Sequence, residues 1–242
     1  MAQLEIRGVW DATLEAIPPE LPPHAVHIWQ RRLSTDDPSL DACFELLSPE
    51  EQEKAARYRV EHPRSDYILT RGTLRSLLSR YLGKDPREIH FRYASHGKPY
   101  VAGNTNLQFN VSHCDGLALL AFVRDREIGV DVERVRPQDD VKKLAERFFS
   151  LNEREKLRSL SGDELHGAFF RCWTRKEAYI KATGDGLSLP LHQFDVSIEP
   201  DAAQALIATR PDAAEAERWT ISNLRIIPGY AAAVAVAKVT SQ

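Results

Sequence analysis

Apolar and polar positions follow two different periods along the chain, and each period predicts its own kind of element. Apolar residues spaced three or four apart between Pro63 and Leu82 predict a helix, which ends at Gly83. Short apolar or alternating runs bounded by turn residues predict strands. Helical patterns also occupy residues 141–149, 151–159 and 163–183, and strand patterns occupy residues 25–31, 107–112, 117–123, 127–135, 193–198, 219–224 and 230–239. The proline-rich residues 1–25 predict an irregular lead-in, and residues 96–99 predict a turn.

Two helices begin with the same signal. Ser48-Pro49-Glu50-Glu51 places proline at the first helical position and glutamate three residues after the cap, which predicts a capping box. The spacing recurs 102 positions later, from Ser150 to Glu153. Two more matches follow in the same order: Thr70-Arg71 with Thr174-Arg175, and Val111-Ser112-His113 with Ile221-Ser222-Asn223. Capping boxes are common, so chance is one explanation, but three ordered matches predict a duplicated α/β unit.

The repeat predicts the fold class and the domain organisation. We expect an α+β fold of sandwich type, a pseudo-twofold duplication with similar α/β halves at residues 1–125 and 126–242. A length of 242 residues allows one large domain or two small ones. The halves would act as one functional unit with the active site between them, because such interfaces are favoured ligand sites. A fused pair of halves also favours a monomer.

Composition and charge exclude several classes of protein. With 43% apolar and 28% charged residues the chain has a globular composition, which excludes general disorder. The formal net charge of -3 argues against a protein held to nucleic acid by charge alone. No apolar run approaches membrane-spanning length, and the N-terminus lacks the pattern of a signal peptide. Three cysteines without a CxxC motif predict a reducing, cytoplasmic location and no zinc site.

The strand at residues 128–133 carries two carboxylates on one face. Side chains alternate on a strand, so Asp131 and Glu133 share a face and the valines between them share the other. Neighbouring carboxylates repel unless a cation or a basic group compensates them. Magnesium often uses one or two carboxylates together with substrate phosphates. A solvated strand face, neutralised by Arg134 and Arg136, is the alternative interpretation.

The helix at residues 163–183 carries a second polar signal. Trp173, Glu177 and Lys181 are spaced four apart and share one stripe of a mostly apolar helix. A plain surface ion pair between Glu177 and Lys181 would explain the last two. Beside a large aromatic residue, the same pair is also suited to projecting into a cleft.

Two further positions are chemically suggestive but individually weak. His113 and Ser112 end a predicted strand, where a lone histidine is more often structural than functional. Lys98 stands between a glycine and a proline, in a stiff turn that could hold its ammonium group in place for a phosphate.

Taken together, these segments resemble the Sfp-type 4'-phosphopantetheinyl transferases. The resemblance rests on Gly129-Val130-Asp131-Val132-Glu133, Trp173-x-x-Lys176-Glu177-Ala178-x-x-Lys181, Phe109-Asn110-Val111-Ser112-His113, Gly97-Lys98-Pro99 and Phe148-Phe149-Ser150. It extends from about Phe44 to Val236. The strand motif combined with the helix motif is highly specific, whereas neither is convincing alone. One position departs from the pattern: Glu51 stands where some members have a basic residue, and Lys54 is a candidate substitute.

The resemblance implies a fold, a reaction and a set of site residues. It implies two α/β halves with coenzyme A and Mg²⁺ in the cleft between them, and transfer of phosphopantetheine from coenzyme A to a serine of an apo acyl or peptidyl carrier protein. It implies that Mg²⁺ is held by Asp131, Glu133 and Glu177. Glu177 would act as the general base, and Lys181 would bind the pyrophosphate. The adenosine end of coenzyme A would be bound by Arg71, Lys98, Ser112 and His113.

A protein substrate also needs a docking surface. Residues 134–147 carry five basic and three acidic side chains, a local excess of +2 that suits an acidic carrier. Leu144 and Phe148 could add an apolar contact there or could face the core instead.

Two other functions use the same residues. Another Mg²⁺-dependent phosphoryl-group enzyme acting on nucleotides would need the same carboxylates. A non-catalytic module that binds coenzyme A or a carrier would keep the fold, although the intact acidic set and Lys181 argue against it.

Overall fold

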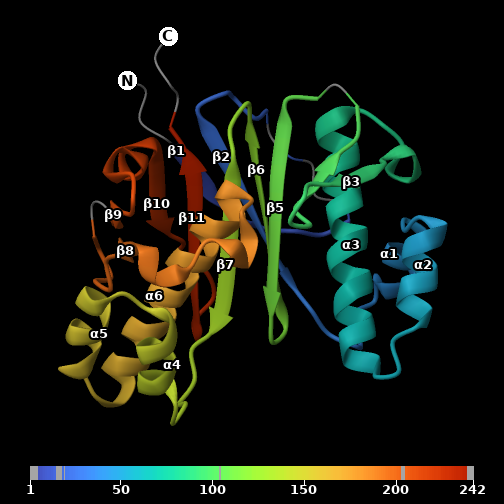
Figure 1. Ribbon diagram of the computed structural model, residues 1–242. Coiled ribbons are helices and arrows are strands. Elements are labelled where there is room, and N and C mark those ends of the chain that lie inside the picture. The colour runs from blue at the N-terminus through green and yellow to red at the C-terminus, as the bar shows by residue number, and fades with distance from the viewer. Residues whose placement is uncertain (1–4, 15–17, 19, 104, 203–204, 239–242) are drawn as a thin grey trace.

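A mixed four-stranded sheet and an antiparallel three-stranded sheet, with helices on their outer faces, form the frame of the molecule (Figure 1). The structure, a computed structural model, describes residues 5–14, 18, 20–103, 105–202 and 205–238. Its helices are α1 (Leu40–Glu45), α2 (Pro49–Ala56), α3 (Glu61–Leu82), α4 (Val141–Phe148), α5 (Leu151–Arg158) and α6 (Gly162–Thr183). Its strands are β1 (Glu5–Asp11), β2 (Ala25–Arg32), β3 (Phe91–Tyr93), β4 (Pro99–Val101), β5 (Leu107–Cys114), β6 (Leu117–Arg124), β7 (Ile128–Arg134), β8 (Phe194–Val196), β9 (Leu206–Thr209), β10 (Trp219–Asn223) and β11 (Tyr230–Ala237).

Apart from β1, the elements of the two halves follow a similar order along the chain. One sheet has the order β1-β2-β6-β5 and the other has the order β10-β11-β7. In the first sheet β2 pairs antiparallel with β6, and in the second β7 pairs antiparallel with β11. Strands β6 and β11 each also pair antiparallel with the strand before them, β5 and β10. Helices α3 and α6 both have 22 residues and both end at a left-handed glycine. The mixed α+β fold is confirmed, while a common origin of the halves and a division at 125/126 stay predictions.

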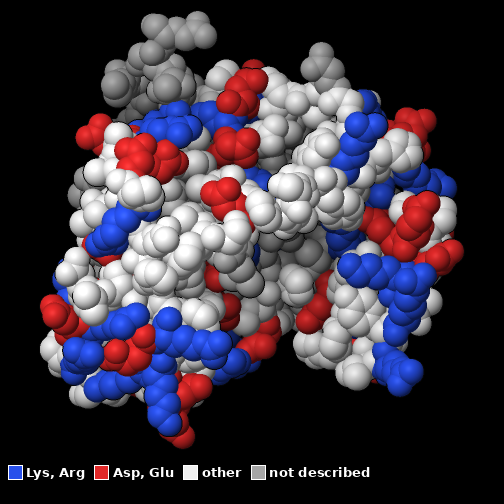
Figure 2. All heavy atoms as spheres, in the orientation of Figure 1, with Lys and Arg blue, Asp and Glu red and all other residues white. Residues whose placement is uncertain are grey.

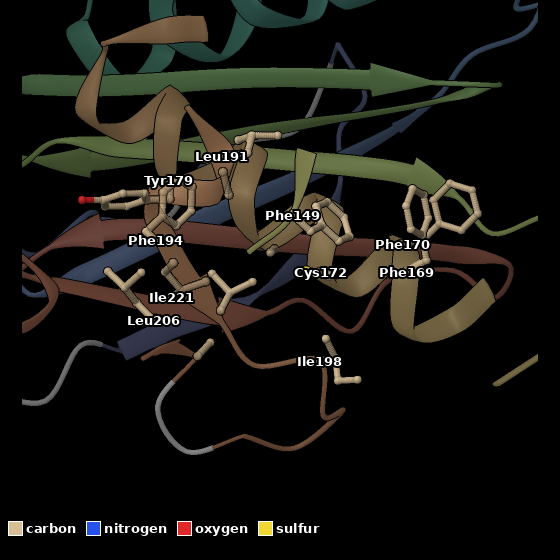
Figure 3. Packing of buried hydrophobic residues seen from close by; sticks show 14 of the residues in the cluster. Phe149, Phe169, Phe170, Cys172, Tyr179, Leu191, Phe194, Ile198, Leu206 and Ile221 are labelled. Carbon is tan, nitrogen blue, oxygen red and sulfur yellow. The ribbon is translucent and has the colours of Figure 1, made fainter. Parts of the chain in front are cut away.

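The two sheets share a core, and each has a second core under its long helix. Alternate residues of β6 separate these cores: Leu117 and Leu119 pack with β7 and β11, whereas Leu120 and Phe122 pack with α3. The core under α6 is rich in aromatic rings from α6 and the segments around it (Figure 3). The two-residue period of β6 therefore contributes side chains to the shared core on one face and to the core under α3 on the other, as the sequence pattern predicts.

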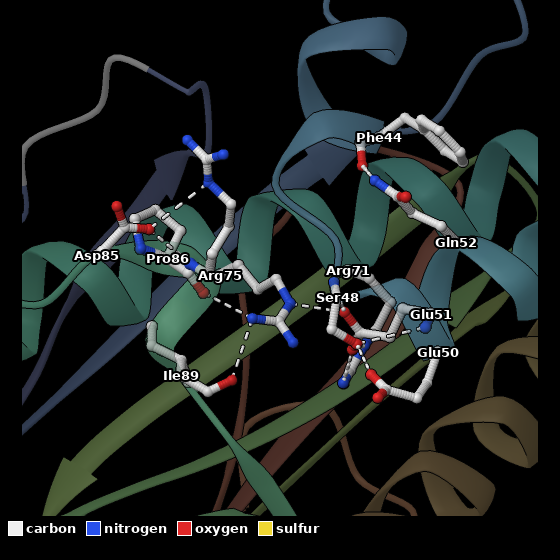
Figure 4. A network of polar contacts seen from close by, with 11 residues as sticks. Phe44, Ser48, Glu50, Glu51, Gln52, Arg71, Arg75, Asp85, Pro86 and Ile89 are labelled. Atoms are coloured by element: carbon white, nitrogen blue, oxygen red, sulfur yellow. Dashed lines mark hydrogen bonds and ion pairs between the residues drawn. The ribbon is translucent and has the colours of Figure 1, made fainter.

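Both halves anchor their long helix with a buried ion pair. The two predicted capping boxes are confirmed, and Glu51 and Glu153 are their third helical residues. Glu51 also accepts a hydrogen bond from Arg75 Nε (2.6 Å), and Glu153 forms an ion pair with Lys176 Nζ (2.8 Å). Each buried cation donates to two backbone carbonyls beyond its helix: Pro86 and Ile89 for Arg75 (Figure 4), and Leu191 and Phe194 for Lys176. Removing one partner of such a pair would leave an uncompensated buried charge.

The halves differ where the long helix crosses the strand that pairs with the last strand of the half, which is β2 in the first half and β7 in the second. In the first half this crossing is aromatic: the Tyr81 hydroxyl lies 2.7 Å from His27 Nδ1 and accepts from Trp29 Nε1 at 3.0 Å. In the second half the crossing is at Gly129. A Cβ atom there would lie 2.1 Å from the carbonyl oxygen of Ala178 and 2.4 Å from the amide nitrogen of Ala182. Only glycine allows α6 to approach β7 this closely.

Some short elements differ from the sequence prediction. The irregular lead-in expected for residues 1–25 is wrong in part, because β1 lies within it and pairs parallel with β2. An irregularity between Ile6 and Val9 interrupts the two-residue period that would have marked it as a strand. The β3–β4 hairpin, α1 and β9 were also not predicted, since each is too short to show a period.

The Gly129 crossing can be tested by adding one methyl group. Gly129→Ala should lower the free energy of unfolding by roughly 1–3 kcal/mol or more, because the new Cβ overlaps the backbone of α6. Gly167→Ala is the matched control, since its Cβ would meet only the end of the Arg171 side chain. Urea titration measures both, and equal stability of the two variants would contradict the close approach.

Candidate functional site

The site is built where the edge strands β5 and β7 lie side by side. Their side chains join the two halves: the Asn110 Oδ1 atom accepts from the Val130 amide (2.9 Å), and the Ser112 hydroxyl donates to Asp131 Oδ1 (2.9 Å). Both bonds are buried. The carboxylate face of β7 is thereby held against the first half, while the opposite face packs in the shared core, as the alternation predicts.

Lys181 completes this contact from α6. Its ammonium donates to Asp131 Oδ1 (2.6 Å) and to the Ser112 hydroxyl (3.0 Å). Asp131 is almost fully buried, and among the described residues its Oδ2 atom has no hydrogen-bond partner. Burial raises the pKa of Asp131, and the Lys181 ammonium opposes that shift. One oxygen of the Asp131 carboxyl group is therefore fixed by two hydrogen bonds, and the other is buried without a hydrogen-bond partner among the described residues.

Two more carboxylates share this environment. Burial raises the pKa of Glu133, and the charge of Asp131 raises it further. Burial, followed by the charge of Asp131, raises the pKa of Glu177 to about 7, with Lys181 opposing. The structure therefore brings Asp131, Glu133 and Glu177 close enough for their charges to interact, as expected from the strand and helix motifs.

The donor atoms suit a hard divalent cation. Three carboxylates, one with a buried oxygen that lacks a partner, offer the oxygen ligands that Mg²⁺ prefers. In the described ranges, however, no three histidine, cysteine or acidic side chains are grouped closely enough to hold an ion as they stand. Lys181 provides the positive charge beside Asp131 in this arrangement.

A cavity of about 230 Å³ opens beside Lys181, between the two halves. It is bounded by the 96–99 turn, by β5 and by the end of α6. The lining residues are His96, Gly97, Lys98, Pro99, Asn110, Val111, Ile180, Lys181, Gly184 and Gly186. The surface is hollowed between the lobe of α4 and α5 and the lobe of α1 to α3, with acidic side chains near the hollow (Figure 2). A small ligand in the cavity would contact both halves.

The residues predicted to bind the coenzyme are only partly brought together. Lys98 lines the cavity, but its ammonium already donates to Glu127 (3.0 Å) and to the Ala182 carbonyl at the end of α6 (2.9 Å). His113 lies near the end of β5, with part of its side chain exposed to solvent. Desolvation of the rest lowers the pKa of His113, the charge of Asp66 opposes this shift, and Lys181 adds a smaller lowering effect. Ser112 is buried and contacts Asp131 and Lys181 rather than the cavity.

Arg71 is paired with an anion, Glu51. Its guanidinium donates from Nε to Glu51 Oε1 (2.8 Å) and also forms a short contact from Nη2, so Glu51 joins Arg71 and Arg75 (Figure 4). The acidic residue that departs from the family pattern is therefore a structural partner of two arginines. Lys54, the candidate substitute, lies over the Tyr67 ring at 5.0 Å.

Several residues of the site were not assigned a role from the sequence. Gly129 controls the approach of α6, Asn110 joins the strands, and Cys114 donates its thiol hydrogen to Glu133 Oε2 (3.3 Å). For Asn110 and Cys114 the sequence does hold a signal. Together with Ser112 they have a two-residue spacing, which matches the spacing of Asp131 and Glu133 on β7. The parallel contact between these strands could not be read from either strand alone.

Known proteins match both halves of the chain. A family model of the 4'-phosphopantetheinyl transferase superfamily matches residues 127–235, and one of the 4'-phosphopantetheinyl transferase N-terminal region matches residues 33–124. The 4'-phosphopantetheinyl transferase HetI of Nostoc sp. is 39% identical over 215 residues, which are 88% of this chain and 87% of HetI. This chain belongs to the 4'-phosphopantetheinyl transferase family.

Other relatives agree with this assignment. The 4'-phosphopantetheinyl transferase Sfp of Bacillus subtilis is 32% identical over 192 residues, which are 79% of this chain and 83% of Sfp. A putative 4'-phosphopantetheinyl transferase of Synechocystis sp. is 35% identical over 78% of this chain and 76% of its own length. The predicted resemblance is confirmed, and the protein is a 4'-phosphopantetheinyl transferase, of a family that acts on carrier proteins with coenzyme A. Within the described ranges, no helix combines the length and the hydropathy needed to cross a bilayer.

The raised pKa of Glu177 predicts a stability change that depends on pH. Glutamate ordinarily titrates near 4.5 and Glu177 near 7, so between these values the folded protein retains a proton that the unfolded chain releases. Stability is therefore lost as the pH rises through that window. Glu177→Gln should match the parent below pH 4.5 and exceed it by on the order of 1–3 kcal/mol above pH 7.

Thermal or urea unfolding in a chelating buffer measures this effect across the pH range. Glu155→Gln, at an exposed position of α5, is the matched control and should change nothing. A parent-like stability of Glu177→Gln at pH 8 would contradict the desolvated carboxyl group.

Proposed function

We propose that the protein transfers the phosphopantetheine group of coenzyme A to a serine of an apo acyl or peptidyl carrier protein in a Mg²⁺-dependent reaction. A serine oxygen forms a bond to the β-phosphorus, the bond to the bridging oxygen breaks, and adenosine 3',5'-bisphosphate leaves. The observation that carries the proposal is the convergence of Asp131, Glu177 and Lys181 beside a cavity between the halves. Family membership supports the choice of substrates.

Asp131, Glu133 and Glu177 are the residues that would hold Mg²⁺. The unpartnered Oδ2 atom of Asp131 and the crowding of the three carboxylates support this role. When bound, the ion neutralises charge on the pyrophosphate and on the carboxylates.

Glu177 is suited to accept the proton of the carrier serine. Burial and the charge of Asp131 raise the pKa of Glu177 to about 7, and a cation bound beside it would lower this pKa and keep the carboxylate ionised, as a base requires. Its place on α6, one helical turn before Lys181, directs the base and the cation to the same region. The serine oxygen becomes a better nucleophile as its proton moves to the Glu177 carboxylate.

Lys181 is suited to stabilise the leaving phosphate. Its ammonium contacts Asp131 and Ser112 and also lines the cavity, so it can exchange one of these contacts for a phosphate oxygen. A preorganised cation at the leaving group favours the transition state over the ground state. Ser112 keeps the ammonium in place, in addition to its predicted contact with the coenzyme.

The adenosine end of coenzyme A would lie across the 96–99 turn and β5. Lys98 would contact it from the turn and His113 from β5. Lys98 also joins the turn to the end of α6 through its hydrogen bond to the Ala182 carbonyl. Arg71 would need to share its guanidinium between Glu51 and the 3'-phosphate. Of the four predicted residues, Lys98 is therefore the best placed and Arg71 the most constrained by its existing contact.

The carrier would dock on the basic surface of α4. Figure 2 shows Lys and Arg side chains gathered over α4 and α5, and Lys142, Lys143 and Arg147 are exposed there. Leu144 and Phe148 pack partly against the core, so they offer only part of their surface. Leu151 at the start of α5 is 71% exposed and supplies an apolar contact beside the charges. Action as a monomer and a cytoplasmic location stay predictions.

The proposed reaction adds mass to the carrier. Incubation with coenzyme A, Mg²⁺ and a panel of apo carriers should add one phosphopantetheine group to the carrier serine, as measured by intact-protein mass spectrometry. Asp131→Ala should abolish the addition while the protein stays folded, because removing a crowded, buried carboxylate relieves repulsion. Cleavage of coenzyme A without transfer to any carrier would favour a nucleotide hydrolase, and binding of coenzyme A without turnover would favour a non-catalytic module.

The docking surface predicts an effect that depends on salt. Replacing Lys142 and Lys143 together by glutamate should lower kcat/KM for an acidic carrier by about tenfold at low ionic strength and by less at high salt. Lys84→Glu, also exposed but just beyond the end of α3, is the control for a change in net charge. An unchanged kcat/KM for the double variant would place the carrier elsewhere.

A further inference from the structure

Cys114 differs from the other two cysteines in its exposure and its partner. Cys43 and Cys172 are fully buried in the cores, whereas Cys114 is half-buried at the end of β5. Its thiol donates a hydrogen bond to Glu133 Oε2 at 3.3 Å, across the contact between β5 and β7. The thiol hydrogen is the donor in this bond, and the carboxylate oxygen accepts it.

The Cys114–Glu133 bond continues a regular set of contacts. Two residues earlier on each strand, the Ser112 hydroxyl donates to Asp131 at 2.9 Å. Each carboxylate of β7 thus receives one hydrogen bond from the facing residue of β5. Since the two strands are not joined by a backbone ladder, these side chains set their relative position.

The turn that carries Cys114 is fixed from both halves. The Tyr230 hydroxyl donates to the Asp115 carbonyl (2.5 Å), and the Arg136 guanidinium contacts the Asp115 carboxylate (2.8 Å). On the other side, the Leu33 amide donates to the Gly116 carbonyl (2.8 Å). A thiol placed on such a turn has little freedom to leave Glu133.

We propose that Cys114 is a positioning residue for Glu133, orienting its carboxylate toward the cation that the proposed function requires. The inference rests on that function for the role of Glu133 and goes beyond it in assigning the thiol. Hydrogen bonds to a ligand's second atom fix its orientation and typically change metal affinity by about 10–100-fold. A thiol is a poor ligand for a hard ion such as Mg²⁺, so donation to Glu133 is the role its chemistry suits.

The test measures Mn²⁺ binding directly. Mn²⁺ is added to the protein in the presence of coenzyme A, free Mn²⁺ is followed by electron paramagnetic resonance, and a protein-free titration corrects for binding to the coenzyme. Cys114→Ala should weaken Mn²⁺ binding by about tenfold, and Cys114→Ser, which keeps a donor, should recover most of that loss. Ser159→Ala, which removes an exposed hydroxyl donor just after α5, should bind as the parent does.

Reversible modification gives a second measurement without a variant. Methyl methanethiosulfonate converts the Cys114 thiol to a methyl disulfide and releases methanesulfinate, while the buried Cys43 and Cys172 are protected. Mn²⁺ affinity should fall on modification and return with dithiothreitol. The Cys114→Ser protein should not respond to the reagent.

Three results would overturn the inference: parent-like Mn²⁺ affinity of Cys114→Ala, equal losses in the alanine and serine variants, or a parent protein that binds no Mn²⁺. A lower melting temperature of Cys114→Ala with unchanged Mn²⁺ affinity would make the thiol purely structural. Failure of the proposed function has a different signature, in which the parent modifies no carrier although its Mn²⁺ binding still depends on Cys114.

Discussion

The close contact between α6 and β7 at Gly129 is the constraint on which the site depends. A helix normally stands off a strand by the thickness of its side chains, but here the strand offers a backbone without a Cβ atom. Asp131, two residues further along the same face, is then within reach of Lys181. Glycine is thus the geometric condition for a short polar contact between a strand and a helix that are separate in sequence.

The electrostatics of the site follow from that proximity. Burial penalises each of three carboxyl groups, and each negative charge penalises the others, so the set is costly for the folded protein. Lys181 compensates only part of this cost, because one ammonium faces three acids. Binding of a further positive charge beside these groups would offset part of that cost.

Elements with a strong local signal could be predicted from the sequence, and contacts between distant segments could not. The long helices, their glycine ends and both capping boxes follow from periodicity and local hydrogen bonding. The strand carboxylates and Lys181 follow from spacing and family resemblance. The partner of Arg71 could not be predicted, because Glu51 belongs to a capping box as well as to an ion pair formed across helices. The contact of the Ser112 hydroxyl with Asp131 could not be predicted either, because it depends on the approach of β5 to β7.

The aromatic contact in the first half shows how the two halves differ in chemistry. Where α6 and β7 meet through an ammonium and a carboxylate, α3 and β2 meet through Tyr81, His27 and Trp29. The contact of α3 with its sheet is therefore filled with aromatic rings, whereas the contact of α6 with its sheet is polar. Two long helices of equal length thus meet their sheets through different chemistry, and the crowded carboxyl groups lie where α6 meets β7.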